Sequence, residues 1–205
     1  TRVGRRVALK RIAGEASEEL LERFWREAQA LARIRHPGVV QIHDFGEDAR
    51  GRYLVMALVE GRDLADIWDR CANVGRAFPV PLAVHIIREC LRGLHYAHTF
   101  PGLGLVHRDV SPSNILISYA GDVKVGDFGV AKAAIQRNLT ETGTLKGKVG
   151  YMSPEQVTGE PIDARSDVFA AGVGYGPMSA RLVYGHVPRA TGPSGDVLMF
   201  STDVA

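Results

Sequence analysis

The sequence predicts an α+β fold of two lobes, with a strand-rich first part and a mainly helical second part. Strand-like apolar runs and one helical stripe precede Gly61, and longer helical stripes follow it. The 205 residues are 45% hydrophobic and 23% charged, which is ordinary globular usage and enough chain for two small lobes around one core. We therefore divide the chain into residues 1–60, 61–173 and 174–205.

Residues 7–12 are rich in Val, Leu and Ile and predict a strand. Ser17 suits the cap of a helix that begins near Glu18 and ends before Pro37, which cannot continue it. The apolar face of this helix is formed at helical spacing by Leu20, Phe24, Ala28 and Leu31. One strand followed by one amphipathic helix is thus expected at the start of the first lobe.

A hairpin and a connector complete the first part. Residues 39–45 and 53–59 predict two strands, because the polar, Gly-containing link 46–52 between them suits a turn. Residues 60–62 form a short connector to the second lobe. Asp63 then suits the cap of a short helix that runs through Trp68.

The second part predicts further helices and two short strands. Pro81 suits the first turn of a helix over 81–99, whose apolar stripe is formed by Ala83, Ile87, Cys90, Leu94 and Ala97. Residues 115–118 and 123–125 predict strands, and a last apolar helix begins at Asp163 or Ser166 and ends at Val173. Residues 174–205 show no sustained period and many Gly and Pro, so they are either loop-rich or a sequence not meant for this fold, such as a shifted reading frame.

Composition excludes several classes of function. The formal net charge of +2 is too weak to indicate binding to nucleic acid, and no apolar run reaches the roughly 18 residues of a membrane span. Two cysteines, Cys71 and Cys90, exclude a disulfide scaffold and a Cys-rich zinc site, and they fit a reducing compartment. We expect a cytoplasmic domain with no membrane segment and no nucleic-acid partner.

Four short elements, taken in order, carry a recognisable pattern. They are Val7-Ala8-Leu9-Lys10, Glu27, His107-Arg108-Asp109 followed by Asn114, and Asp127-Phe128-Gly129. Their order and spacing resemble the signature set of protein kinases, and Ser153-Pro154-Glu155 is a close variant of the Ala-Pro-Glu motif. Over about residues 3–173 the chain resembles a Hanks-type (eukaryotic-like) bacterial serine/threonine protein kinase. The resemblance implies a protein-kinase-like fold that is incomplete, with a small lobe lacking its first strands and a truncated large lobe.

The resemblance also implies a role for each charged residue of the pattern. Phosphoryl transfer spreads negative charge over the γ-phosphate oxygens, so its catalysis is mainly positioning and electrostatics. Lys10 would bind the α- and β-phosphates of ATP, held by an ion pair with Glu27. Asp109 would orient the attacking hydroxyl of a protein substrate, and Asn114 and Asp127 would hold Mg²⁺.

Further residues would bind the nucleotide or support the site. Met56 would lie behind the adenine, the backbone of residues 57–59 would face its edge, and Asp63 would reach the ribose. The full set implied for nucleotide binding is Lys10, Ala8, Met56, Ala57, Leu58, Val59, Asp63, Leu116 and Asp127. His107 would be structural and pack against Phe128, in an apolar stack extended by Leu31 and Ile42.

Departures from the family pattern leave alternatives open. Ser111 stands where serine/threonine kinases usually carry Lys, and Lys148 stands where they usually carry Thr. Either Lys148 returns the missing ammonium to the γ-phosphate, or it is a solvent lysine and the site is weakened. Thr140 and Thr142 are the expected phosphorylation sites, where a phosphate would pair with Arg108.

The ends of the pattern are also altered. Only nine residues precede Lys10 and they hold one glycine, Gly4, so the Gly-rich phosphate loop is not in this chain and we expect an N-terminal truncation. Glu155 usually pairs with an arginine from a later helix; if buried and unpaired it would cost several kcal/mol in order of magnitude. Arg181 and Arg189 are the possible substitutes.

Two other functions compete with a protein kinase. A pseudokinase or inactive fragment would bind nucleotide and protein without transfer. A small-molecule phosphotransferase of the same fold would keep the catalytic Asp and Asn, but it lacks a segment ending in Pro-Glu, so Pro154-Glu155 argues against it.

Overall fold

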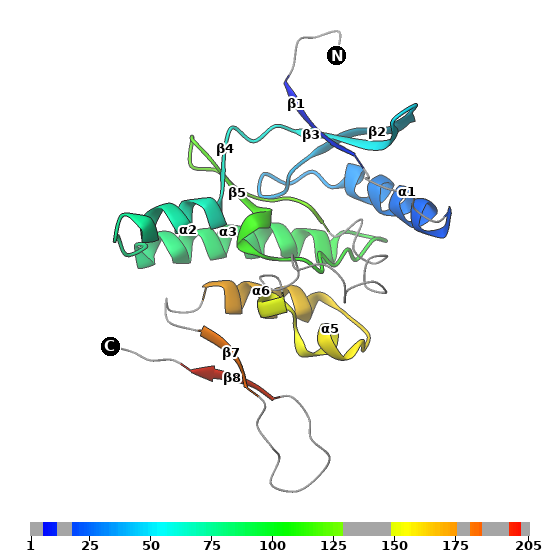
Figure 1. Cartoon of the computed structure of the whole chain (residues 1–205). Helices are drawn as coiled ribbons and strands as arrows, with labels where there is room; N and C mark the ends of the chain where they lie inside the picture. The colour runs from blue at the N-terminus through cyan, green and yellow to red at the C-terminus, as the bar shows by residue number, and fades with distance from the viewer. Residues whose placement is uncertain (1–5, 12–17, 129–148, 176–180, 186–196, 202–205) are drawn as a thin grey trace, which may run out of the picture.

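The structure is a computed structural model that describes residues 6–11, 18–128, 149–175, 181–185 and 197–201. A small lobe of β1, β2, β3 and α1 lies above a mainly helical lobe that also contains a short second sheet (Figure 1). The two-lobed α+β prediction is therefore confirmed.

The small lobe is an antiparallel sheet with one helix beside it. The strands are β1 (Val7–Arg11), β2 (Ile42–Asp48) and β3 (Gly51–Ala57), in the order β1-β3-β2, and α1 spans Glu18–Arg33. The predicted hairpin is confirmed, but most of its expected link is strand. Gly46 explains why: it pairs with Tyr53, and a Cβ there would lie 2.6 Å from the Tyr53 hydroxyl oxygen, so the missing side chain lets the strand continue past the ring.

The segment between α1 and β2 joins the small lobe to the large one. The backbone of Val125 donates to the Gly38 carbonyl at 2.8 Å and accepts from the N–H of Val40 at 2.9 Å. The Lys124 ammonium donates to the Pro37 carbonyl at 2.6 Å. Because these bonds tie residues 37–40 to the sheet of the large lobe, the end of α1 has a fixed position relative to that lobe.

The large lobe begins with a strand where the sequence predicted a connector. β4 (Gly61–Asp63) pairs with β5 (Ile115–Ser118), which pairs with β6 (Val123–Val125). Asp63 caps α2 as predicted, since its Oδ1 accepts the N–H of Asp66 at 2.8 Å. α2 (Leu64–Asn73) runs past the predicted end at Trp68, and α3 (Val80–Thr99) matches its prediction within one residue at its start.

The remaining elements of the large lobe come after Asp109 in the chain. They are a single 3-10 turn at Pro112–Asn114, another at Val149–Tyr151, α5 (Pro154–Thr158) and α6 (Ala164–Tyr175). β7 (Arg181–Gly185) and β8 (Val197–Ser201) form an antiparallel pair that the sequence analysis did not predict. No helix in the described part of the chain has the length and apolar character needed to cross a membrane.

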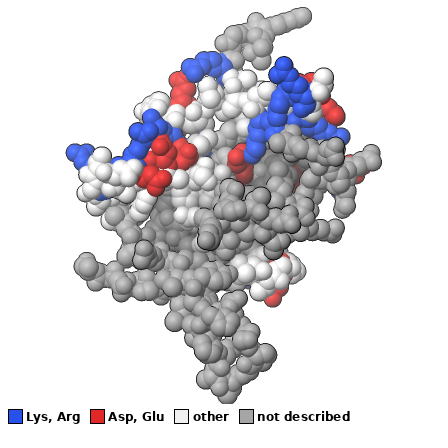
Figure 2. All heavy atoms as spheres, viewed as in Figure 1, with Lys and Arg blue, Asp and Glu red and all other residues white. Residues whose placement is uncertain are grey.

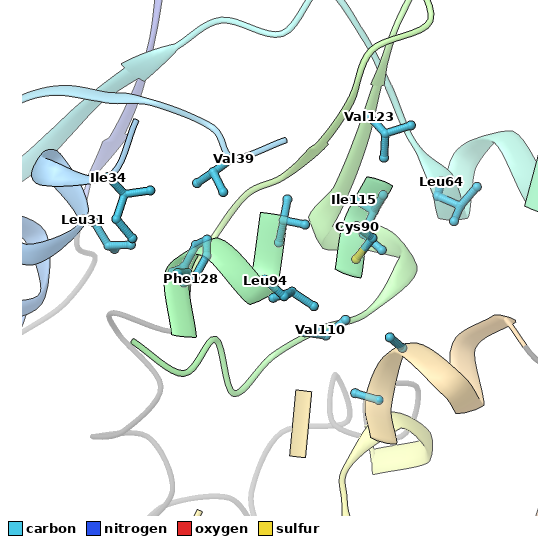
Figure 3. Packing of buried hydrophobic residues seen from close by; sticks show 14 of the residues in the cluster. Leu31, Ile34, Val39, Leu64, Cys90, Leu94, Val110, Ile115, Val123 and Phe128 are labelled. Carbon is cyan, nitrogen blue, oxygen red and sulfur yellow. The ribbon is translucent and has the colours of Figure 1, made fainter. Parts of the chain in front are cut away.

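One buried cluster connects the two lobes. Leu31 from α1 and Ile34 just after it lie on one side of Val39 and Phe128, and Leu94, Ile115 and Cys90 continue the cluster into the large lobe (Figure 3). Burying an aliphatic or aromatic side chain of this size stabilises the fold by about 1.5–3 kcal/mol. The core therefore fixes the position of Phe128, the residue that follows Asp127.

Candidate active site

Lys10 and Asp127 meet between the lobes. The apolar strand β1 carries Lys10, whose Nζ lies 2.7 Å from Asp127 Oδ1. The two side chains are 45% and 44% exposed, so solvent screens the pair. Its contribution to stability is therefore only about 0–1 kcal/mol. The contact therefore matters for position: it brings together the predicted phosphate-binding cation and a predicted metal ligand.

Backbone bonds hold Asp127 in an unusual conformation. Asp127 has φ 53°, in the left-handed region that costs a non-glycine residue about 1–2 kcal/mol. Gly126, directly before it, donates to the Asn114 carbonyl at 2.9 Å and accepts from His107 Nε2 at 2.8 Å. These bonds fix the peptide that leads into Asp127 and tie it to the loop that carries Asp109.

Asp109 and Asn114 form the second pair of the site. The buried Asn114 amide nitrogen donates to the Asp109 carbonyl at 2.7 Å and to its Oδ2 at 2.8 Å. Both hydrogens of the amide are thereby used, so its oxygen is the end suited to a cation. This bond holds the Asp109 carboxylate and points the Asn114 amide in one direction.

His107 supports the site from below and is neutral. Its ring centroid lies 4.5 Å from that of Phe128, which confirms the predicted packing. The Asp109 N–H donates to Nδ1 at 3.2 Å, so Nε2 carries the proton that is donated to Gly126. Complete burial lowers the pKa of His107, because the charged form would lose its hydration.

Asp167, in the first turn of α6, is a supporting residue to which the sequence analysis gave no role. Its buried carboxylate accepts the backbone N–H of His107 at 2.7 Å and of Arg108 at 2.8 Å, and it lies 2.7 Å from His98 Nε2. No local signal reveals these bonds, because the partners lie about sixty residues earlier in the chain. Asp167 thus anchors the catalytic loop on α6.

Several residues predicted to bind nucleotide lie together at the start of the large lobe. Val59, Asp63 and Leu116 line one open cavity of about 290 Å³. Ala8 pairs with Met56 across β1 and β3. The remaining two predicted residues are Ala57, whose N–H is already donated to the Gln41 carbonyl at 2.8 Å, and the partly exposed Leu58. At Ala57 only the carbonyl is therefore left for an adenine.

Other predictions are not decided by these contacts. Glu27 lines a different cavity with Leu31, Arg108 and Phe128, and its ion pair with Lys10 stays a prediction. Lys148, Thr140 and Thr142 lie outside the described residues, as does Arg189, and the side chain of Arg181 is not described either.

Glu155 has a partner that the sequence analysis did not anticipate. It is half-buried, and it accepts a hydrogen bond from the Ser166 hydroxyl. That bond lowers the pKa of Glu155. The carboxylate is thus neither fully buried nor unpaired, and the large cost considered for it does not arise.

The donor set fits a metal ion that is shared with a phosphate. In the described part of the chain, no three His, Cys, Asp or Glu side chains gather in a way that could hold a metal ion by themselves. Mg²⁺ typically takes one or two protein oxygens and completes its shell with water and substrate phosphates. The Asp127 carboxylate and the Asn114 amide oxygen match this pattern, with the Lys10 cation nearby for the phosphates.

Comparisons with known proteins find a family model and curated relatives that match most of the chain. The profile of the protein kinase domain matches residues 1–193. The chain is 42% identical over 191 residues to serine/threonine-protein kinase PknL of Mycobacterium tuberculosis, covering 91% of this chain and 45% of PknL. It is 38% identical over 176 residues to tyrosine-protein kinase MasK of Myxococcus xanthus, covering 82% of this chain and 27% of MasK. The chain thus spans less than half the length of these curated relatives.

A solved structure shows the same fold. The crystal structure of the Mycobacterium tuberculosis PknI kinase domain superposes with a TM-score of 0.63 at 29% sequence identity, covering 81% of this chain and 60% of that chain. The protein-kinase-like arrangement that the sequence predicted is therefore confirmed.

Proposed function

Since this chain belongs to the protein kinase family, we propose that it transfers the γ-phosphate of MgATP to serine or threonine hydroxyls of a protein. The observation that carries the proposal is the meeting of Lys10 and Asp127 at 2.7 Å, next to the loop on which Asn114 holds Asp109. The relative PknL, which is named a serine/threonine-protein kinase, supports the choice of hydroxyl.

Each residue of the site has a defined role in this proposal. Lys10 binds the α- and β-phosphates, supported by Glu27, and Asp109 orients the substrate hydroxyl and accepts its proton. Asn114 and Asp127 hold Mg²⁺, which neutralises phosphate charge when bound. The cavity of Val59, Asp63 and Leu116, with Ala8, Met56, Ala57 and Leu58, holds the adenosine.

Ser111 favours a second candidate, transfer to tyrosine. Ser111 is 4% exposed and its hydroxyl lies 3.1 Å from that of Ser113. Two hydroxyls thus stand where serine/threonine kinases usually carry a lysine, so this mark of serine or threonine transfer is missing. MasK, which is named a tyrosine-protein kinase, is similar to this chain. Analysis of the phosphorylated amino acid in the product separates the two candidates.

Lys148 is the proposed source of the missing ammonium at the γ-phosphate. Replacing Lys148 by Ala should then slow transfer strongly, and the double change Ser111→Lys with Lys148→Thr should restore it. If Lys148→Ala leaves the rate of phosphate transfer unchanged, the hypothesis that Lys148 supplies this ammonium in place of a lysine at position 111 is wrong.

We also propose a cytoplasmic domain with protein partners. Figure 2 shows basic and acidic side chains close together among the described residues of this face. Arg62 pairs with Asp66 and Arg11 pairs with Asp48, so neighbouring carboxylates offset these two cations. Cys71 and Cys90 are free thiols, which fits a reducing compartment.

The proposal is tested by measuring Mg²⁺-dependent ATP binding and phosphate transfer, to the chain itself and to a generic basic protein. We expect Asp127→Ala to lose both, and Asp109→Asn to keep binding and lose transfer. The matched control is Arg165→Ala on α6, which breaks an exposed ion pair with Asp163. It should leave ATP binding and transfer unchanged. ATP binding without transfer in the unaltered chain would instead indicate a pseudokinase.

A further inference from the structure

The peptide before Asp109 is held on both sides by side chains from the lower helices. Arg108 has φ 65°, a left-handed conformation that costs a non-glycine residue energy and persists only where neighbours enforce it. Its N–H donates to Asp167 Oδ1 at 2.8 Å, and its carbonyl accepts from Gln156 Nε2 at 2.9 Å. Because Asp109 follows directly, the direction of its carboxylate depends on this peptide.

The side-chain amide of Gln156 on α5 bonds to two residues: it accepts the backbone N–H and the hydroxyl of Ser153, and it donates to Arg108. Its Oε1 accepts the backbone N–H of Ser153 at 3.1 Å, which is the side-chain half of a capping box at the start of α5. Its Nε2 donates to the Arg108 carbonyl. If the amide were flipped, its NH₂ group would face the Ser153 N–H and its oxygen would face the Arg108 carbonyl. Neither contact is a hydrogen bond, so the two partners permit only one orientation of the amide.

We propose that Gln156 is a positioning residue for phosphoryl transfer, which holds the Arg108 carbonyl and thereby aims the Asp109 carboxylate. This inference rests on the proposed kinase function. Gln156 does not line the cavity of Val59, Asp63 and Leu116. Its effect should therefore fall on the rate of transfer and leave nucleotide affinity unchanged.

Gln156→Glu separates the two bonds of this side chain. Glutamate is the usual partner in a capping box, so the bond to Ser153 and the start of α5 are retained. The donor to Arg108 is lost, and a carboxylate oxygen faces the carbonyl instead. We expect kcat to fall about fivefold to tenfold with the KM for ATP unchanged, and the melting temperature to fall less than in Gln156→Ala, which loses the capping bond as well.

A control on the same helix tests whether α5 alone matters. Thr158 donates to the Pro154 carbonyl at 3.1 Å and is exposed, so Thr158→Val alters α5 without touching the catalytic loop. It should keep the kcat of the unaltered chain. Gln156→Ala removes both bonds of Gln156 and should lower kcat and the melting temperature together.

Amide hydrogen exchange gives a second readout that needs no catalysis. Gln156→Glu should speed exchange in the peptide that contains residues 107–109 and leave the peptide of α6 unchanged. If the unaltered chain transfers no phosphate, the proposed function fails while exchange still tests Gln156. The positioning role is wrong if Gln156→Glu shows unaltered kcat and exchange, or if it lowers the melting temperature as much as Gln156→Ala does.

Discussion

Lys10 on β1 and Asp127 after β6 form an ion pair between the two lobes, with 2.7 Å between Nζ and Oδ1. The cation proposed to bind phosphate and the carboxylate proposed to bind metal thus neutralise each other in the protein alone. Because both side chains are about half exposed, separating them costs little free energy. In the proposed function, the phosphates of MgATP would replace Asp127 at Lys10, and the metal would replace Lys10 at Asp127.

Lys10→Met should consequently abolish transfer while barely changing stability. We expect transfer to fall at least about a hundredfold, since removal of one preorganised charge costs that much in comparable sites. The free energy of unfolding should change by less than about 1 kcal/mol, because the lost pair is screened by solvent. Urea unfolding and a transfer assay on the same sample measure both effects. A loss of several kcal/mol would show that Lys10 is a structural residue.

Stability should fall on mild acidification because His107 is buried in its neutral form. Its pKa is lowered in the folded protein by burial, whereas in the unfolded chain it titrates near the ordinary value of about 6.5. Above that pH, the contribution of neutral His107 to the free energy of unfolding is fully present. Below it, the unfolded chain binds a proton at His107 while the folded protein does not, so stability falls until the pH reaches the pKa of the folded state. His36, whose pKa burial also lowers, acts in the same direction.

His107→Phe isolates the contribution of His107. The free energy of unfolding at pH 7.5 and at pH 5.5 should differ less in this variant than in the unaltered chain, by up to about 1.4 kcal/mol for each pH unit. The variant is itself less stable, because it leaves the Gly126 carbonyl and the Asp109 N–H without their partner. Equal pH slopes in both proteins would contradict the account of His107.

Gly61 should tolerate no side chain. A Cβ at this position would lie 1.9 Å from the Ile117 carbonyl oxygen, so β4 and β5 could not pair at their present distance. We expect Gly61→Ala to destabilise the chain by about 1–3 kcal/mol or more, as overpacking against a backbone does. Gly172→Ala is the matched control: no atom of the described residues that surround it lies within 4 Å of a Cβ there, and alanine favours the helix by about 0.5–1 kcal/mol. Thermal unfolding of both variants checks the contrast.

Elements with strong local signals were predicted well from the sequence. Ile115–Ser118 and Val123–Val125 are strands with the predicted bounds, and Asp63 caps a helix as expected. β4 was missed because Gly61–Asp63 becomes a strand only through pairing with Leu116–Ser118, more than fifty residues later. A three-residue strand has no periodicity that could announce it.

The residues of the site were likewise predicted only in part from the sequence. The motif residues were named by their resemblance to a family, and the structure brings Lys10 to Asp127 and Asn114 to Asp109. Asp167 and Gln156 hold the backbone of residues 107–108, and the sequence analysis did not assign this role to them. Both bind backbone atoms about fifty to sixty residues away, and a backbone partner leaves no trace in residue types.

Calorimetric titration with ATP, with and without Mg²⁺, tests most directly whether these residues converge on a metal-bound nucleotide. The account predicts binding that Mg²⁺ strengthens at least about tenfold in the unaltered chain, and binding by Asp127→Ala that Mg²⁺ does not strengthen. ATP affinity that is the same with and without Mg²⁺ in the unaltered chain, or no binding at all, would contradict it.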